Sequence, residues 1–177
     1  MKLLGLLRHA KSDWDDAGLR DFDRGLNDRG RKGAALMGEH IAKHGVAWKH
    51  IVASPAERVT RTLEASGVRG EITRDKRLYL ASADEILDVL QGTEGDPRTV
   101  LLVGHNPGLQ DLIAELVAAE AEDALFNEAT EKFPTAAFAV LECDIESWAG
   151  LAPGCARLIH LARPRDLDPE LGPELTQ

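Results

Sequence analysis

The sequence has few cysteines and no long apolar run. Among its 177 residues only Cys143 and Cys155 could form a disulfide, which is too few for a disulfide framework, and we expect both to be thiols in a reducing compartment. A membrane-spanning helix needs about 20 consecutive apolar residues. No stretch approaches that length, so no transmembrane segment is predicted.

Positive charge is also scarce, since 21 Lys and Arg residues stand against 30 Asp and Glu residues, for a net charge of −9. Nucleic acids and anionic membranes call for a basic surface, so we expect neither as a partner. An anionic ligand would have to be held locally by a few cationic side chains. The short apolar run at the start meets Arg8 and no small-residue cleavage site, which predicts a cytoplasmic protein.

What the chain does contain is an alternation of strand and helix patterns. Continuous apolar runs at 3–7 and 99–103 are typical of strands buried on both faces of a parallel sheet. The pattern predicts an α/β three-layer sandwich with a mainly parallel central sheet flanked by helices, whose last strands run antiparallel at an edge. The other expected strands are 50–53, 71–78, 136–141 and 156–161, and the expected helices are 27–44, 55–66, 83–91 and 109–117.

The chain is of a length typical of one domain. We expect a single domain over residues 1–163. Residues 164–177 carry three prolines and no apolar period, which predicts a loosely held C-terminal tail.

Polar residues suited to phosphate chemistry follow three of the expected strands. Arg8 and His9 end the first strand, and Gly104 and His105 follow the fourth. Arg58 falls in the first turn of the helix after the second strand, for which Ser54 is a natural N-cap and Pro55 a natural first residue. Each of these residues alone is weak evidence for a site. Because ligands bind outside the carboxyl ends of strands in open α/β sheets, we expect these side chains to converge.

The expected cluster suits a phosphoryl group. Arginine holds phosphate through a planar fork of donors, and a helix N-terminus adds backbone amides. A neutral imidazole can attack phosphorus, because its ordinary pKa of about 6.5 leaves much of it unprotonated at pH 7. We assign that role to His9 and expect His105 to donate a hydrogen bond to the phosphoryl group.

Three segments carry a resemblance to a known family: Leu7-Arg8-His9-Ala10-Lys11-Ser12, Ser54-Pro55-Ala56-Glu57-Arg58-Val59-Thr60-Arg61-Thr62 and Val103-Gly104-His105-Asn106-Pro107. They resemble the signatures of the histidine phosphatase superfamily, which has the phosphoglycerate mutase-like fold. The resemblance is closest to its SixA-like phosphohistidine phosphatase branch, through Arg24-Gly25-Leu26 and Leu78-Tyr79-Leu80 as well. It implies that His9 is the phosphorylated nucleophile, that Arg8, Arg58 and His105 complete the phosphate pocket, and that Arg24 adds a further phosphate contact.

The sequence departs from the family pattern at two positions. Ala10 stands where most of the superfamily has glycine, and Gly25 replaces the usual proline after Arg24. An ion pair of Arg24 with Asp21 or Asp23 is as well supported as a phosphate contact. Three further carboxylates are candidate proton donors, although each also fits a solvated charge or a helix cap: Asp13, Asp16 and Glu85.

His40 and His44 lie four residues apart on the first expected helix, a spacing that can bind a metal. No Glu-rich or Cys-rich context accompanies them, and a solvated face or a partner of the helix C-terminal dipole is the favoured reading. We therefore expect neither a metal nor a cofactor.

Only one short helix is expected between Leu80 and Arg98, where many superfamily members carry a lid. An open site suits a phosphorylated side chain on another protein, so we expect a metal-independent phosphohydrolase acting on phosphohistidine proteins in two steps. A small-molecule or sugar-phosphate monoesterase of the same mechanism, a mutase, a binding module without turnover and a metal hydrolase are the alternatives. The partner is thus a phosphorylated protein or a small phosphorylated substrate, and the oligomeric state is open.

Overall fold

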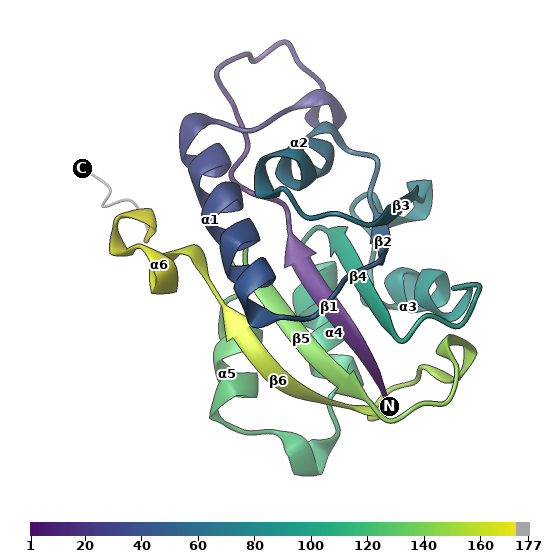
Figure 1. Ribbon diagram of the computed structural model, residues 1–177. Helices are drawn as coiled ribbons and strands as arrows, with labels where there is room; N and C mark the ends of the chain where they lie inside the picture. Colours follow the sequence, from purple (N-terminus) through teal and green to yellow (C-terminus); the bar gives the residue numbers. More distant parts are fainter. Residues whose placement is uncertain (173–177) are drawn as a thin grey trace.

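A computed structural model describes residues 1–172, which form a six-stranded sheet with helices on both faces (Figure 1). The strand order is β3-β2-β4-β1-β5-β6. Neighbours β3, β2, β4 and β1 pair in parallel, whereas β5 pairs antiparallel with β1 and β6 antiparallel with β5. The expected architecture, with antiparallel strands at one edge, is confirmed. The strands are β1 Lys2–Arg8, β2 His50–Ala53, β3 Glu71–Arg74, β4 Thr99–Gly104, β5 Phe138–Cys143 and β6 Ala156–Ala162.

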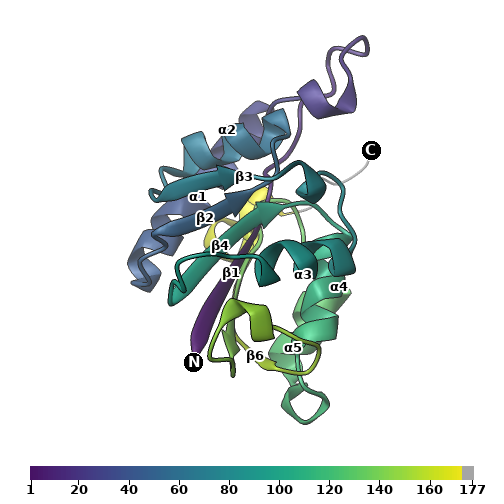
Figure 2. The same cartoon turned by 90° about the vertical axis from the view of Figure 1, so that its right-hand side faces the viewer.

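The helices form the two outer layers (Figure 2). On one face α1 (Asp28–His44) and α2 (Glu57–Ser66) pack their apolar stripes on the sheet. The other face is covered by α3 (Ala83–Gln91), α4 (Gly108–Leu116) and α5 (Ala124–Glu131). Within residues 1–172, no helix is long and apolar enough to cross a bilayer. Both cysteines are free thiols, Cys143 buried and Cys155 half-buried.

Most expected helix ends are confirmed, but α2 begins later than predicted. The side chain of Asn27 caps α1 by accepting a hydrogen bond from the Gly30 amide at 2.7 Å. In α2, Ala56 and not Ser54 is the N-cap residue, because the Ser54 hydroxyl lies 2.8 Å from the His105 ring and accepts from the Ala56 amide. Strand β3 ends at Arg74, four residues early, because the Asp75 side chain caps a 3-10 turn over Lys76–Leu78.

The segment expected as a loosely held tail from residue 164 onward is ordered through Gly172. Pro164 is buried as the first residue of helix α6 (Pro164–Leu167), and a 3-10 turn follows at Pro169–Leu171. Lys32 of α1 pairs with Asp168 at 3.3 Å, and Arg29 donates to the Gly172 carbonyl. The prolines therefore start helical turns here, at positions that need no amide donor. The rest of the expected tail, 173–177, lies outside the described residues.

The connections at the centre of the sheet open a crevice. Strand β1 continues into α1 on one face, whereas the adjacent β4 continues into α4 on the opposite face (Figure 2). The last residues of the two strands, Arg8 and Gly104, pair in register. Chains that leave neighbouring parallel strands toward opposite faces create the usual ligand crevice of an open α/β sheet.

Close packing of α1 on α2 depends on Gly38, and this yields a prediction about stability. A Cβ at Gly38 would lie 1.8 Å from the Ser66 carbonyl oxygen, whereas a Cβ at Gly33 of the same helix would be in ordinary contact with Pro164 at 3.9 Å. We expect Gly38→Ala to lower the free energy of unfolding by about 1–3 kcal/mol or more, because the helix must shift. Gly33→Ala should instead raise it by about 0.5–1 kcal/mol through lost backbone entropy of the unfolded chain. Urea unfolding of both variants checks this, and equal effects would contradict the packing described here.

Candidate active site

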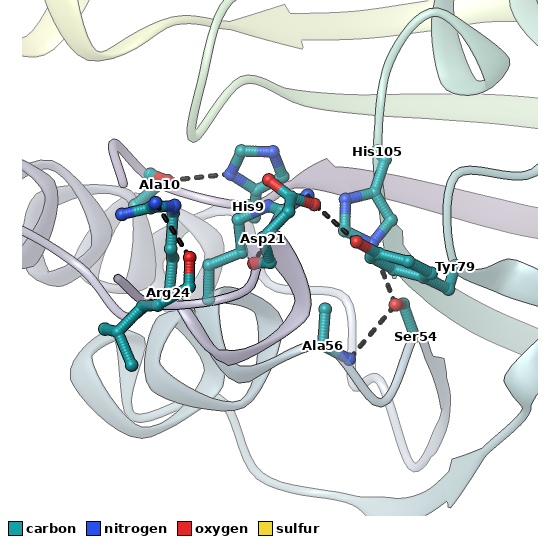
Figure 3. Close-up of polar contacts among 10 residues, drawn as sticks. His9, Ala10, Asp21, Arg24, Ser54, Ala56, Tyr79 and His105 are labelled. Carbon is teal, nitrogen blue, oxygen red and sulfur yellow. Dashed lines mark hydrogen bonds and ion pairs between the residues drawn. The ribbon is translucent and has the colours of Figure 1, made fainter. Parts of the chain in front are cut away.

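Two histidines face each other across the crevice between β1 and β4. Figure 3 shows the His9 and His105 rings side by side, with Asp21, Tyr79 and Ser54 around them. The ring centroids of the two histidines are 5.2 Å apart, and both side chains are buried. The structure thus brings together the histidines that follow the two most apolar strands.

The hydrogen bond of His9 defines which of its ring nitrogens can react. Nδ1 lies 2.8 Å from the Ala10 carbonyl oxygen, which can only accept, so Nδ1 carries the hydrogen and Nε2 carries the lone pair. Burial lowers the pKa of His9 from 6.5 to about 4, with the Arg8 and Arg58 charges acting in the same direction against the Ala10 hydrogen bond. His9 is therefore neutral at pH 7, with a free nitrogen held off the end of a rigid strand.

The two ring nitrogens of His105 have different surroundings. Nε2 lies 2.8 Å from the Ser54 hydroxyl, whereas the buried Nδ1 has no hydrogen-bond partner among residues 1–172. Burial and then the neighbouring His9 lower the pKa of His105 to about 3. When the Ser54 hydroxyl donates to Nε2, the hydrogen of the neutral ring resides on Nδ1, which can donate to an incoming oxygen. Ser54, expected to cap α2, contacts the His105 ring instead.

Two guanidinium groups flank the histidines. Arg8 donates through one terminal nitrogen to the Phe133 carbonyl at 3.1 Å, and its buried Nε has no hydrogen-bond partner up to Gly172, the last described residue. Arg58, from the first turn of α2, is 5% exposed. Burial, and then the charge of Arg58, lower the pKa of Arg8. The charges of half-buried Arg8 and buried Arg58 repel, and Nε of Arg8 and Nδ1 of His105 find no acceptor in the described part of the chain. This edge is therefore suited to an anion that accepts several hydrogen bonds.

Asp21 supplies a carboxylate to the site that the sequence analysis did not assign there. Arg58 donates to the Asp21 backbone carbonyl at 2.9 Å and to its carboxylate at 3.0 Å, and the Tyr79 hydroxyl donates to the same carboxylate oxygen. The hydrogen bond from Tyr79 and the Arg58 contact lower the pKa of Asp21. Tyr79 belongs to the Leu78-Tyr79-Leu80 segment, which is the only sequence signal that pointed to this contact.

Thr62 links the nucleophile segment to α2. Its hydroxyl accepts from the Ala10 amide at 2.8 Å and donates to the Arg58 carbonyl at 2.7 Å. Thr62 is fully buried and lies one helical turn after Arg58. This bridge fixes the chain after His9 relative to Arg58, and the i+4 spacing from Arg58 is the signal that could have identified it.

Arg24 makes neither of the ion pairs considered from the sequence. Its guanidinium donates to the carbonyls of Asp16 and Leu19 at 2.8 and 2.9 Å, and the Trp14 ring lies 4.1 Å from it. These contacts brace the long loop after β1. Arg24 thus holds the loop that also presents Asp21.

The three candidate proton donors are used in local structure. The Asp13 carboxylate accepts from the Asp15 amide and that of Asp16 from the Gly18 amide, which shapes turns of the loop. Glu85 forms a capping box with Ser82 at the start of α3, as the sequence predicted. None of these contacts joins them to the histidines, whereas Asp21 contacts Arg58 directly.

The predicted pair His40 and His44 gains a third histidine from β6. Nε2 of His40 lies 2.8 Å from Nε2 of His160, and the His44 and His160 ring centroids are 4.3 Å apart. Burial lowers the pKa of His160 to about 4. Across residues 1–172, no group of three or more His, Cys, Asp or Glu side chains has an arrangement that could hold a metal ion.

Comparison with known proteins identifies the family. Residues 4–79 match the model of the histidine phosphatase superfamily, branch 1. The uncharacterized protein Rv1276c of Mycobacterium tuberculosis is 34% identical over 160 residues, which cover 90% of this chain and all of that protein. The chain belongs to the histidine phosphatase superfamily. The predicted family is thus confirmed.

Solved structures place the chain among the SixA-like members of the superfamily. The SixA structure from Nakamurella multipartitia has a TM-score of 0.82 and 32% identity, over 92% of this chain and 96% of the other. The SixA structure from Agrobacterium tumefaciens has a TM-score of 0.75 and 30% identity, over 92% and 98%. The chain is a phosphatase of this superfamily with the phosphoglycerate mutase-like fold.

Proposed function

We propose that the protein removes phosphate from phosphohistidine side chains of other proteins, through a phosphorylated His9. The observation that carries the proposal is the grouping of the neutral His9, whose Nε2 bears the lone pair, with two buried donors that have no acceptor within residues 1–172, Nε of Arg8 and Nδ1 of His105. A phosphoryl group placed there meets a nucleophile on one side and hydrogen-bond donors at its oxygens.

The proposed reaction has two steps. In the first, Nε2 of His9 bonds to phosphorus as the bond from phosphorus to the substrate imidazole breaks, and the leaving imidazole takes up a proton from solvent water. Arg8, Arg58 and His105 neutralise the charge on the phosphoryl oxygens. In the second, a water oxygen bonds to phosphorus, the bond to His9 breaks, and inorganic phosphate leaves with the neutral imidazole regenerated. An imidazole leaving group lowers the need for a positioned acid.

A protein substrate is supported by the surroundings of the site. The interval between Leu80 and β4 contains α3 and no inserted lid domain. Three of the exposed large apolar side chains belong to segments that carry site residues, namely Trp14, Leu19 and Leu80. Trp14 is 64% exposed and Leu80 56% exposed. Exposed aromatic and aliphatic side chains around a catalytic residue are suited to contact with a protein surface.

The substrate class is tested by comparing kcat/KM on a phosphohistidine peptide with kcat/KM on a panel of sugar phosphates. We expect the peptide to be preferred. The His9→Ala variant, run beside the wild type, separates enzymatic turnover from spontaneous loss of phosphate. A strong preference for the sugar phosphates would contradict the proposed substrate and favour a monoesterase of the same mechanism.

The burial of both histidines predicts their titration. With folded-state pKa values of about 4 for His9 and about 3 for His105, both rings should stay neutral at pH 5.5 and gain protons only below that. An unfolded chain binds those protons near pH 6.5, so stability should fall as the pH drops from about 6.5 toward 4. Nitrogen NMR titration of the imidazoles and melting temperatures between pH 7.5 and 4.5 measure both effects. Titration of the His9 ring near 6.5 in the folded protein would contradict this environment.

A further inference from the structure

A second concavity lies at the same edge of the sheet as the histidines. Its volume is about 200 Å³. Its walls come from the chain after β1, from the first turns of α1, from the segment before β5 and from α6 with the turn that follows it. Figure 1 shows α6 beside α1. The lining residues used below are Ala10, Lys11, Arg29, Gly33, Lys132, Pro134, Thr135, Ala136, Pro164, Arg165 and Leu171.

Among residues 1–172, four cationic side chains and no Asp or Glu line this concavity: Lys11, Arg29, Lys132 and Arg165. Within the same residues, the side chains of Lys132 and Arg165 make no hydrogen bond or ion pair. Two acids of the α6 segment have other partners, since Asp168 pairs with Lys32 and Asp166 with Arg163. In a chain of net charge −9, this local excess of positive charge favours an anion.

Most of the remaining lining is apolar, from Ala10, Gly33, Pro134, Ala136, Pro164 and Leu171, and Thr135 adds a hydroxyl group. Such a lining can contact the methylene groups of a bound side chain while the cations meet its charged end. A glutamate or aspartate side chain has this combination of a short apolar stem and a terminal carboxylate.

The concavity is built on the same backbone as the nucleophile. Ala10, in its wall, directly follows His9 and accepts the hydrogen bond of its ring. On the opposite wall the Ala136 amide donates to the carbonyls of both Arg8 and His9, at 3.1 and 3.0 Å. The concavity is therefore adjacent to the phosphate pocket, and a substrate whose phosphohistidine lies in that pocket can place a nearby side chain in the concavity.

We propose that this concavity binds an acidic side chain of the phosphorylated protein, close in its sequence to the phosphohistidine. The protein then selects phosphohistidine segments that carry Asp or Glu beside the modified residue. This inference rests on the proposed function, because it names the kind of sequence that the same site prefers.

The test uses two phosphohistidine peptides that differ only in Glu against Gln at the flanking positions. We expect the acidic peptide to have a kcat/KM about 5- to 10-fold higher, as partly exposed charge pairs provide. The difference should lie in KM. It should disappear in the double variant Lys132→Gln, Arg165→Gln, whose turnover of p-nitrophenyl phosphate should be unchanged. The matched control is Lys43→Gln, Arg69→Gln, which removes exposed cations at the other edge of the sheet.

The possible failures are distinguishable. If neither peptide is hydrolysed by the wild type, the proposed function is wrong. If both are hydrolysed with equal kcat/KM, or if the acidic preference persists in the double variant, the proposed function stands and the acidic-residue pocket is wrong.

Discussion

Replacing His9 by alanine is expected to lower kcat for phosphohistidine hydrolysis by about 10⁴-fold or more and to abolish phosphorylation of the protein. The Nε2 lone pair of His9 is held beside Arg8 and Arg58 by the bond from Nδ1 to Ala10. The neighbouring His105 is not placed to replace it, because its Nε2 lies against the Ser54 hydroxyl. The effect should therefore be on chemistry and not on folding.

The measurement is phosphate labelling of the protein by a phosphoryl donor, with the label tested for acid lability and base stability. His50→Ala is the matched control, since His50 begins β2 at the opposite end of the sheet. It should be labelled like the wild type. Equal labelling of His9→Ala and the wild type would show that the nucleophile is another residue.

Replacing Arg58 by alanine should lower kcat/KM by about 10²- to 10³-fold, because a guanidinium that stabilises the phosphoryl oxygens is lost. Arg58→Lys should recover only part of the loss, since an ammonium group cannot make the two parallel hydrogen bonds of a guanidinium. Steady-state kinetics on phosphohistidine peptide and on p-nitrophenyl phosphate should show similar losses, because both present the same phosphoryl group.

Arg61→Ala is the control for Arg58, from the same helix. Arg61 is exposed and pairs with Glu57 and Glu64, and its loss should change kcat/KM less than 2-fold, as expected for surface pairs worth ~0.2–1 kcal/mol. Melting curves of both variants confirm that each is folded. Equal kinetic effects of the two substitutions would contradict a phosphate-binding role for Arg58.

The site residues that could be predicted from the sequence are those that directly follow a strand, because the end of the strand determines their position. Arg8, His9 and His105 follow continuous apolar runs, and parallel strands bring their carboxyl ends to one edge whatever the loops do. The contacts of Asp21 could not be predicted in this way. Its partners Arg58 and Tyr79 are 37 and 58 positions away, and only the folded path of the loop after β1 brings them together.

Local rules failed where a side chain had a distant partner. Ser54 has the residue type and position of a helix cap, but His105, 51 positions away, occupies its hydroxyl. The prolines after residue 163 suggested a loosely held tail, yet Pro164 is buried beside α1 and Lys32 pairs with Asp168. In both cases a tertiary contact outweighed a local propensity of about 1 kcal/mol.

The contact between Asp21 and Arg58 has a consequence for the end of the catalytic cycle. Because the carboxylate and a phosphate group compete for one guanidinium, binding of phosphate at Arg58 exchanges one anion for another. The binding free energy of inorganic phosphate is then less favourable than at an arginine that has no carboxylate partner within the protein. A protein substrate can offset this difference through its other contacts, whereas inorganic phosphate has no such contacts and dissociates readily. We therefore expect Asp21 to weaken inhibition of the proposed hydrolysis by its product, inorganic phosphate.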